Sequence, residues 1–156
     1  MKIFLEECCT IEKLAARIYR QFAERTHYPE NIRQIFLEIA EDEMERARII
    51  DKLIQAPGYG LVTTPGLPDQ KVDEKLQLAK ALLFNAEHSE LSACDALQLA
   101  LESEARLVEV HANQALIPGS PTLTAFFSAL FQCERAHVDT LRACLETCQP
   151  EGSLQT

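Results

Sequence analysis

Apolar residues recur every three or four positions through four long stretches of the chain, which is the spacing that predicts amphipathic helices. Segments rich in proline, glycine and serine separate the stretches, and no segment shows the alternating pattern of a strand. Ser92 and Asp95 form an S-x-x-D arrangement typical of a helix start. The predicted helices run from about Ile3 to Thr26, from Pro29 to before Pro57, from Ser92 to before Pro118, and from Pro121 to before Pro150.

The second and third stretches are separated by about 35 residues, which is too long for a simple hairpin loop in a compact bundle. Helical spacing from about Asp69 to Asn85 predicts a short extra helix within this crossover. The chain also repeats itself, because the residues around Glu43 and Glu134 align at an offset of 91. Two helical hairpins joined by a long crossover are the connectivity of ferritin-like bundles. We therefore predict an all-α, ferritin-like four-helix bundle over residues 1–149, followed by a tail over residues 150–156.

Each predicted bundle helix carries one glutamate in the middle of its apolar stripe: Glu12, Glu43, Glu104 and Glu134. Ionised carboxylates that converge in a dry core are costly and repel one another, and a divalent metal ion compensates both effects. The last glutamate begins a Glu-x-x-His motif that ends at His137, and residues three apart on a helix face the same way. The pattern predicts a metal site, although glutamates that point to solvent or are protonated and hydrogen-bonded remain an alternative.

The first helix resembles that of rubrerythrin and its relatives, with Glu12 followed by Ala15, Tyr19, Phe22 and Ala23. The third bundle helix resembles the same pattern around Glu104, with His111 where tyrosine is usual. We expect His111 to be a buried, hydrogen-bonded histidine near the site, whereas His27 and His88 are expected at the surface.

This resemblance implies a buried iron centre bridged by carboxylates, with Tyr19 as a hydrogen-bond partner behind the ligands. It further implies reduction of peroxide or dioxygen, a non-haem oxidoreductase activity, with electrons from an external donor protein. Manganese or zinc would also suit such ligands. The ligands implied by the resemblance are Glu12, Glu43, Glu104, Glu134 and His137.

Three departures from the family pattern change this picture. Arg46 stands where a second Glu-x-x-His, starting at Glu43, would have its histidine. Leu107 stands where rubrerythrin has a further glutamate, and no C-x-x-C pair of a rubredoxin-like domain is present. One well-formed metal site beside a degraded one is therefore expected. The alternative is a metal-free structural or interaction bundle in which Arg46 replaces an ion.

The formal net charge of −9 argues against nucleic acid or an anionic membrane as a partner. No apolar run approaches the roughly 20 residues that span a bilayer, and the first nine residues, MKIFLEECC, lack the features of a secretion signal. We therefore expect a cytoplasmic protein, with homodimerisation through an exposed helix face. The six cysteines are interpreted mainly as small buried apolar residues.

Overall fold

The structure is a computed structural model that describes residues 2–57, 69–114 and 121–148. The predicted tail over 150–156 lies outside these residues. Helices dominate the described part of the chain, which contains no strand, and the predicted all-α fold is confirmed. The helices are α1 (Lys2–Ala23), α2 (Glu30–Gln55), α3 (Asp69–His88), α4 (Ala93–Gln114) and α5 (Pro121–Thr147).

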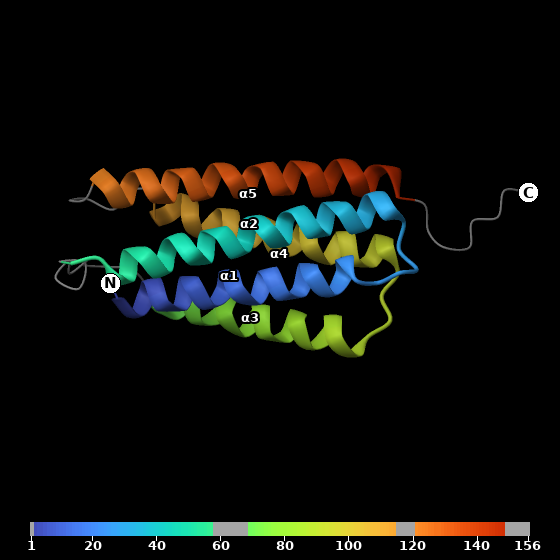
Figure 1. The fold of residues 1–156 in the computed structure, drawn as a ribbon, viewed down its shortest axis with the longest axis horizontal. Coiled ribbons are helices and arrows are strands. Elements are labelled where there is room, and N and C mark those ends of the chain that lie inside the picture. Colours follow the sequence, from blue (N-terminus) through green and yellow to red (C-terminus); the bar gives the residue numbers. More distant parts are fainter. Residues whose placement is uncertain (1, 58–68, 115–120, 149–156) are drawn as a thin grey trace, which may run out of the picture.

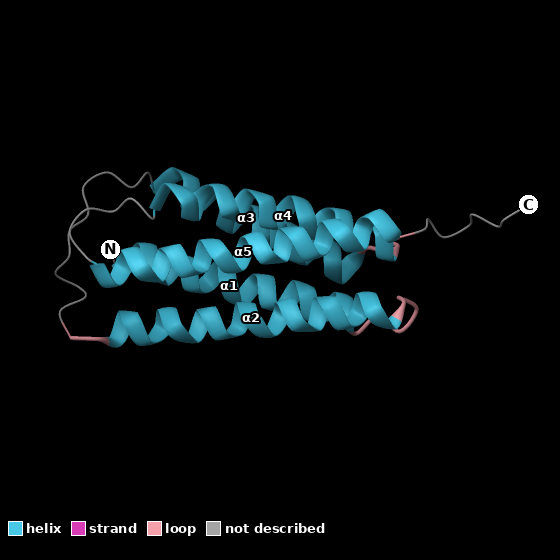
Figure 2. Ribbon diagram, turned by 90° about the horizontal axis from the view of Figure 1, so that it is seen from above, coloured by secondary structure: helices cyan, strands magenta, loops and turns pink. Residues whose placement is uncertain are grey.

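The helices form two long hairpins, α1–α2 and α4–α5, with α3 packed against α1 (Figures 1 and 2). The crossover helix α3 begins at Asp69 as predicted but continues to His88, so it has 20 residues and is not short. It buries Leu82, Leu83 and Ala86 in the core, and Figure 2 shows it on the opposite side of α1 from α2. The crossover therefore adds a fifth helix to the outside of a four-helix bundle.

Hydrogen bonds at one end of the bundle fix the connection from α3 to α4. Arg25, in the turn after α1, donates from Nη2 to the carbonyl oxygens of Ala86 and Ser89 at 2.5 and 2.8 Å. Tyr28 donates from its hydroxyl to the Leu91 carbonyl at 2.7 Å. Because both residues belong to the α1–α2 turn, the start of α4 is tied to the first hairpin.

The predicted S-x-x-D helix start is confirmed at α4. The Asp95 backbone N–H donates to Ser92 Oγ at 3.1 Å, and Ser92 Oγ donates to Asp95 Oδ2 at 2.7 Å. A backbone N–H of the first turn, which has no partner within the helix, thereby finds an acceptor.

The cysteines depart from the interpretation made from the sequence. Cys8, Cys9 and Cys144 are buried and free, as expected, but Cys133 is exposed. Cys94 and Cys148 form a disulfide between the first turn of α4 and the residue after α5, with their Cα atoms 5.8 Å apart. The interpretation as small buried residues was therefore wrong for three of the six.

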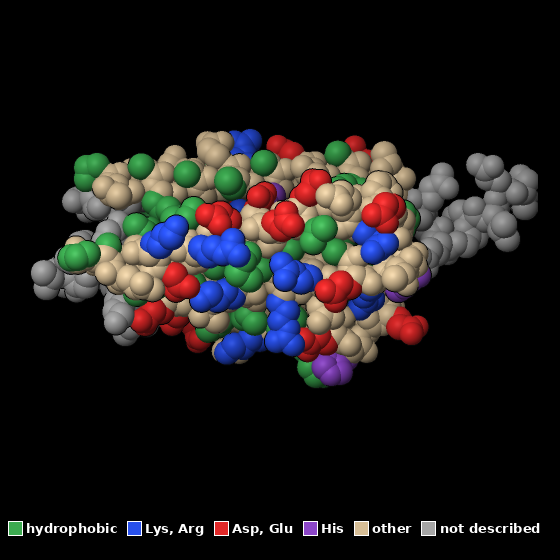
Figure 3. Space-filling view, viewed as in Figure 1, with side chains coloured by type: hydrophobic (Ala, Val, Ile, Leu, Met, Phe, Trp, Pro, Cys, Tyr) green, Lys and Arg blue, Asp and Glu red, His purple; other side chains and the backbone are tan. Residues whose placement is uncertain are grey.

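The apolar core is divided into two clusters by a polar middle layer. One cluster includes Phe22, Phe36 and Leu97, and the other includes Phe127 and Ile50. The layer between them contains the buried charged side chains. Charge on the surface is mixed, since Figure 3 shows acidic and basic side chains interspersed over the face that α1 and α2 present. None of the helices within the described residues has the length and apolarity needed to cross a bilayer.

Candidate metal centre

All four glutamates predicted from the apolar stripes lie inside the bundle. Glu12 is 1% exposed, and Glu43, Glu104 and Glu134 are 0% exposed. Each side chain is delivered by a different helix, because the stripe that buries its apolar neighbours also turns the carboxylate inward. The alternative that some of these glutamates point to solvent is therefore wrong.

Arg46 is buried with the carboxylates and points into the same layer. Its Nε donates to Glu12 Oε2 at 2.8 Å, and its Nη2 donates to Glu43 Oε1. Burial opposes the charge of the guanidinium, but the carboxylates of Glu43 and Glu12 outweigh this effect and raise the pKa of Arg46 well above its usual value. A permanent positive charge therefore links α1 to α2 inside the core.

His137 lies next to this ion pair and faces two of the carboxylates. Its Nδ1 is 3.4 Å from Glu43 Oε1 and 3.4 Å from Glu104 Oε2. Within the described residues, Glu43, Glu104 and His137 form a group whose possible ligand atoms all lie within 4.8 Å of one another. Among the residues that the structure describes, neither His137 Nδ1 nor Glu104 Oε2 has a hydrogen-bond partner. Two carboxylates and one imidazole thus converge on a common point.

The other ring nitrogen of His137, Nε2, contacts Asp42, which was not among the predicted site residues. Asp42 Oδ2 lies 3.1 Å from His137 Nε2, while most of the Asp42 side chain remains exposed. A carboxylate that accepts the Nε2 proton leaves Nδ1 available as a ligand atom and fixes the orientation of the ring. The position of Asp42 directly before Glu43 could have suggested it, but its polar surroundings gave no sign of contact with another helix.

Protonation of His137 is strongly favoured in the metal-free layer. Burial opposes the charge, but the facing carboxylates of Glu104 and Glu43 raise the pKa of His137 to about 10. Counted formally, the four carboxylates and the Arg46 guanidinium sum to −3, and a protonated His137 changes this to −2. Because an ion can bind Nδ1 only after that proton is released, one divalent cation would leave the layer at −1 and two would leave it at +1.

Tyr19 supplies the hydrogen bond expected of it. Its hydroxyl donates to Glu104 Oε1 at 2.5 Å, which holds one oxygen of that carboxylate and leaves Oε2 facing His137. Burial and the nearby carboxylates of Glu104 and Glu43 raise the pKa of Tyr19 well above its usual value, so the phenol keeps its proton. Tyr19 therefore orients a carboxylate without adding charge.

The remaining predicted residues fall into three groups. Glu134 lies in the buried layer on α5, one turn before His137, but it is not part of the converging group. His27 and His88 are exposed, as predicted. The expected burial of His111 concerns a side chain outside those that the structure describes.

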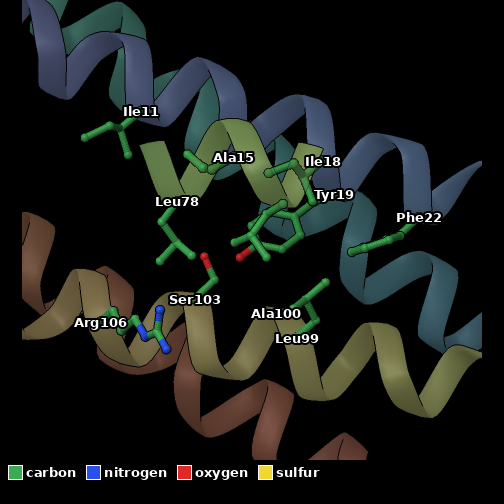
Figure 4. Close-up of a pocket in the computed structure, with 12 residues that line it drawn as sticks. Ile11, Ala15, Ile18, Tyr19, Phe22, Leu78, Leu99, Ala100, Ser103 and Arg106 are labelled. Carbon is green, nitrogen blue, oxygen red and sulfur yellow. The ribbon is translucent and has the colours of Figure 1, made fainter. Parts of the chain in front are cut away.

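A narrow apolar cavity of about 20 Å³ lies between α1, α3 and α4 beside the polar layer (Figure 4). This volume is close to the space that one water molecule requires. Tyr19 of α1 forms part of the wall, and Ser103 and Arg106 line it from α4. Tyr19 therefore borders this cavity and also binds the Glu104 carboxylate through its hydroxyl.

These side chains fit one metal ion better than two. The group around His137 offers one imidazole nitrogen, after loss of its proton, and two carboxylates, which are ordinary ligands for iron, manganese or zinc. Where a second ion would lie between Glu12 and Glu43, the Arg46 guanidinium already bonds to both. An arginine cannot be deprotonated to become a ligand, so this half of the layer does not fit a metal.

An all-α bundle of two hairpins with a long crossover, and one buried glutamate on each bundle helix, defines a ferritin-like protein of the carboxylate type. The sequence model of the family described as Rubrerythrin matches residues 4–145. The chain belongs to the rubrerythrin family. Searches of curated proteins and of solved structures find no significant match.

Proposed function

We propose that the protein binds a single transition-metal ion, for which iron is the first candidate, through Glu43, Glu104 and His137. The observation that supports this is the convergence of the three ligand atoms within 4.8 Å in a buried layer whose formal negative charge one divalent ion would largely offset. Glu134 and Glu12 contribute negative charge to the same layer, and Asp42 and Tyr19 orient two of the ligands.

A bound iron would supply one-electron redox chemistry and a position for a small oxidant such as peroxide or dioxygen. The chain's own residues would exclude water from the site, since every ligand is at most 6% exposed. Complete reduction of peroxide to water needs two electrons, so a protein with one iron would depend on an external electron donor for each turnover. This oxidoreductase activity is the part of the proposal that rests most heavily on the family.

A second candidate function follows from Arg46. Its hydrogen bonds to Glu12 and Glu43 join α1 to α2 without any ion, so the protein could act as a metal-free structural or interaction bundle. The two proposals differ in what they require at His137. A metal-free bundle keeps this imidazole protonated between the carboxylates, whereas a metalloprotein must release the Nδ1 proton to bind an ion.

The deciding experiment is a metal titration of protein that has been purified without chelator and then stripped. We expect one Fe²⁺, Mn²⁺ or Zn²⁺ per chain, measured by elemental analysis after gel filtration. His137→Ala and Glu104→Gln should lose the ion, while His27→Ala, which changes an exposed histidine, should retain it. No bound ion in the wild type would favour the metal-free bundle. An unchanged metal content in His137→Ala would remove His137 from the ligands and contradict the proposed site.

A further inference from the structure

A second chemically distinctive place lies at the end of the bundle that carries the α1–α2 turn. The Cys94–Cys148 disulfide joins the start of α4 to the end of α5 there, and Figure 1 shows the start of α2 beside them. Cys94 lies ten residues before Glu104 on α4, and this spacing corresponds to about 15 Å along the helix axis. The disulfide is therefore separate from the candidate metal centre.

The disulfide lines a cavity of about 250 Å³ that is partly open to solvent. Cys94 and Cys148, the two cysteines of the disulfide, are partly exposed. A cavity of this size beside a disulfide gives a small molecule access to the sulfur atoms. The other lining residues are Pro29, Asn31, Ile32, Ala93, Cys144 and Thr147.

A third cysteine faces the same cavity. Cys144 lies four residues before Cys148, and residues at this spacing are neighbours on one face of a helix. The helical turn extends to Cys148, because the Cys148 backbone N–H donates to the Leu145 carbonyl at 3.1 Å. Cys144 is a free thiol, and burial raises its pKa, so it remains protonated until it reacts. Cys133, by contrast, is exposed and does not line the cavity.

We propose that Cys94, Cys148 and Cys144 form a thiol–disulfide exchange site in which a low-molecular-weight thiol promotes transfer of the Cys148 disulfide bond from Cys94 to Cys144. The shared partner is Cys148, because it is bonded to Cys94 and lies one turn from Cys144. The site therefore contains the Cys94–Cys148 disulfide and the Cys144 thiol, which can take the place of Cys94 as the partner of Cys148. This inference does not depend on the proposed metal.

The exchange conserves atoms and electrons. In the first step the incoming thiolate attacks Cys148 Sγ, a mixed disulfide forms, the Cys148–Cys94 bond breaks, and Cys94 leaves as a thiolate that takes a proton from water. In the second step Cys144 loses its proton to water and attacks Cys148 Sγ. The Cys144–Cys148 disulfide forms and the small thiol is released. The product disulfide joins two residues one helical turn apart, where Cβ atoms in a helix are about 5–6 Å apart, so the turn that carries Cys148 after α5 must open as this disulfide forms. The link between α4 and α5 is then lost.

The test follows the mixed disulfide in folded protein with glutathione as the probe. Samples are quenched with acid, alkylated and mapped by mass spectrometry. In the wild type we expect free Cys94, a Cys144–Cys148 disulfide and little glutathione on Cys148. In Cys144→Ser the second step is blocked, and glutathione bound to Cys148 should rise at least tenfold. Cys133→Ser should behave as the wild type.

Cys144→Ala serves as a second variant, because alanine keeps the buried position apolar if serine disturbs folding. Circular dichroism checks that both variants retain their helices. The proposal is overturned if the Cys94–Cys148 disulfide in folded wild-type protein resists glutathione and opens only in denaturant. It is also overturned if the Cys144 variants and the wild type carry equal amounts of glutathione.

Discussion

At the scale of single residues, Arg46 is the side chain that we expect to limit how much metal the core can hold. Its guanidinium occupies the space between Glu12 and Glu43 and supplies a charge that no change of pH in the ordinary range removes. A buried charge that has lost its partner typically costs 3 to 5 kcal/mol, so the two glutamates depend on this arginine when no ion is bound.

Arg46→His should raise the metal content from one ion per chain toward two. The substitution creates a Glu-x-x-His motif with Glu43 and removes a positive charge from the layer, and both changes favour a second cation. Elemental analysis of the purified variant measures the effect. Arg48→His is the matched control, because Arg48 is an exposed arginine on the same helix and its replacement should leave the content unchanged. A variant that still holds one ion or none would show that Arg46 does not limit the site.

The raised pKa of His137 has a defined consequence for stability without metal. The group has a pKa of about 10 in the folded protein and 6.5 as its ordinary value. Its protonation therefore stabilises the fold fully below pH 6.5, and this stabilisation is lost as the pH rises through 10. In the presence of a chelator, the difference in unfolding free energy between wild type and His137→Gln should shrink from pH 6 to pH 10. His27→Gln, at an exposed site, should show no such trend, and a constant difference for His137→Gln would contradict the assignment.

At the scale of the helices, the start of α4 depends on its cap. Ser92→Ala removes the hydroxyl that accepts the Asp95 N–H, which should lower the unfolding free energy by about 1 kcal/mol. Urea unfolding followed by circular dichroism measures this change. Thr10→Ala is a suitable control, because the Thr10 hydroxyl donates to Glu6 within α1 and caps no helix end. Equal losses in the two variants would contradict a capping role.

The helices and the inward direction of their glutamates could be predicted from the sequence because both follow from apolar spacing on one helix. The spacing around Glu43, for example, places Phe36, Ile39, Ala47 and Ile50 on its face, and all are buried. Contacts between helices could not be predicted in the same way. Nothing in the residues around Asp42 specifies that it meets His137, 95 positions away.

The same limit applies to the disulfide. Cys94 and Cys148 have no motif spacing, and their pairing depends on where the ends of α4 and α5 meet. The length of α3 was also underestimated, since its last turn, beyond Asn85, has little apolar pattern and is fixed partly by Arg25 at the Ala86 carbonyl. The disulfide pairing and the last turn of α3 both depend on contacts between helices, which the spacing of apolar residues along one helix does not specify.

At the scale of the whole molecule, the disulfide closes a ring of chain that includes Glu104, Glu134 and His137, and its two cysteines have a sequence separation of 54. Closing such a loop restricts the unfolded chain and typically stabilises the fold by about 2 to 4 kcal/mol. Cys94→Ser should therefore lower the urea midpoint measured without reductant. Cys133→Ser, which changes an exposed cysteine outside the cavity, should leave the midpoint unchanged. Equal midpoints for Cys94→Ser and the wild type would show that the ring contributes nothing.

The position of Arg46 also bears on the order in which the protein is assembled. Glu12, Glu43 and Arg46 all belong to α1 and α2, which are neighbours in sequence, so the first hairpin brings a positive charge to both of its buried carboxylates as it forms. A bundle that relied on two ions would have to wait for metal before its carboxylates could come together. Because the positive charge here belongs to Arg46, a residue of the chain itself, the first hairpin can close without any metal ion. The protein can therefore fold before it meets an ion, and in the proposed function metal would enter a site that has already formed.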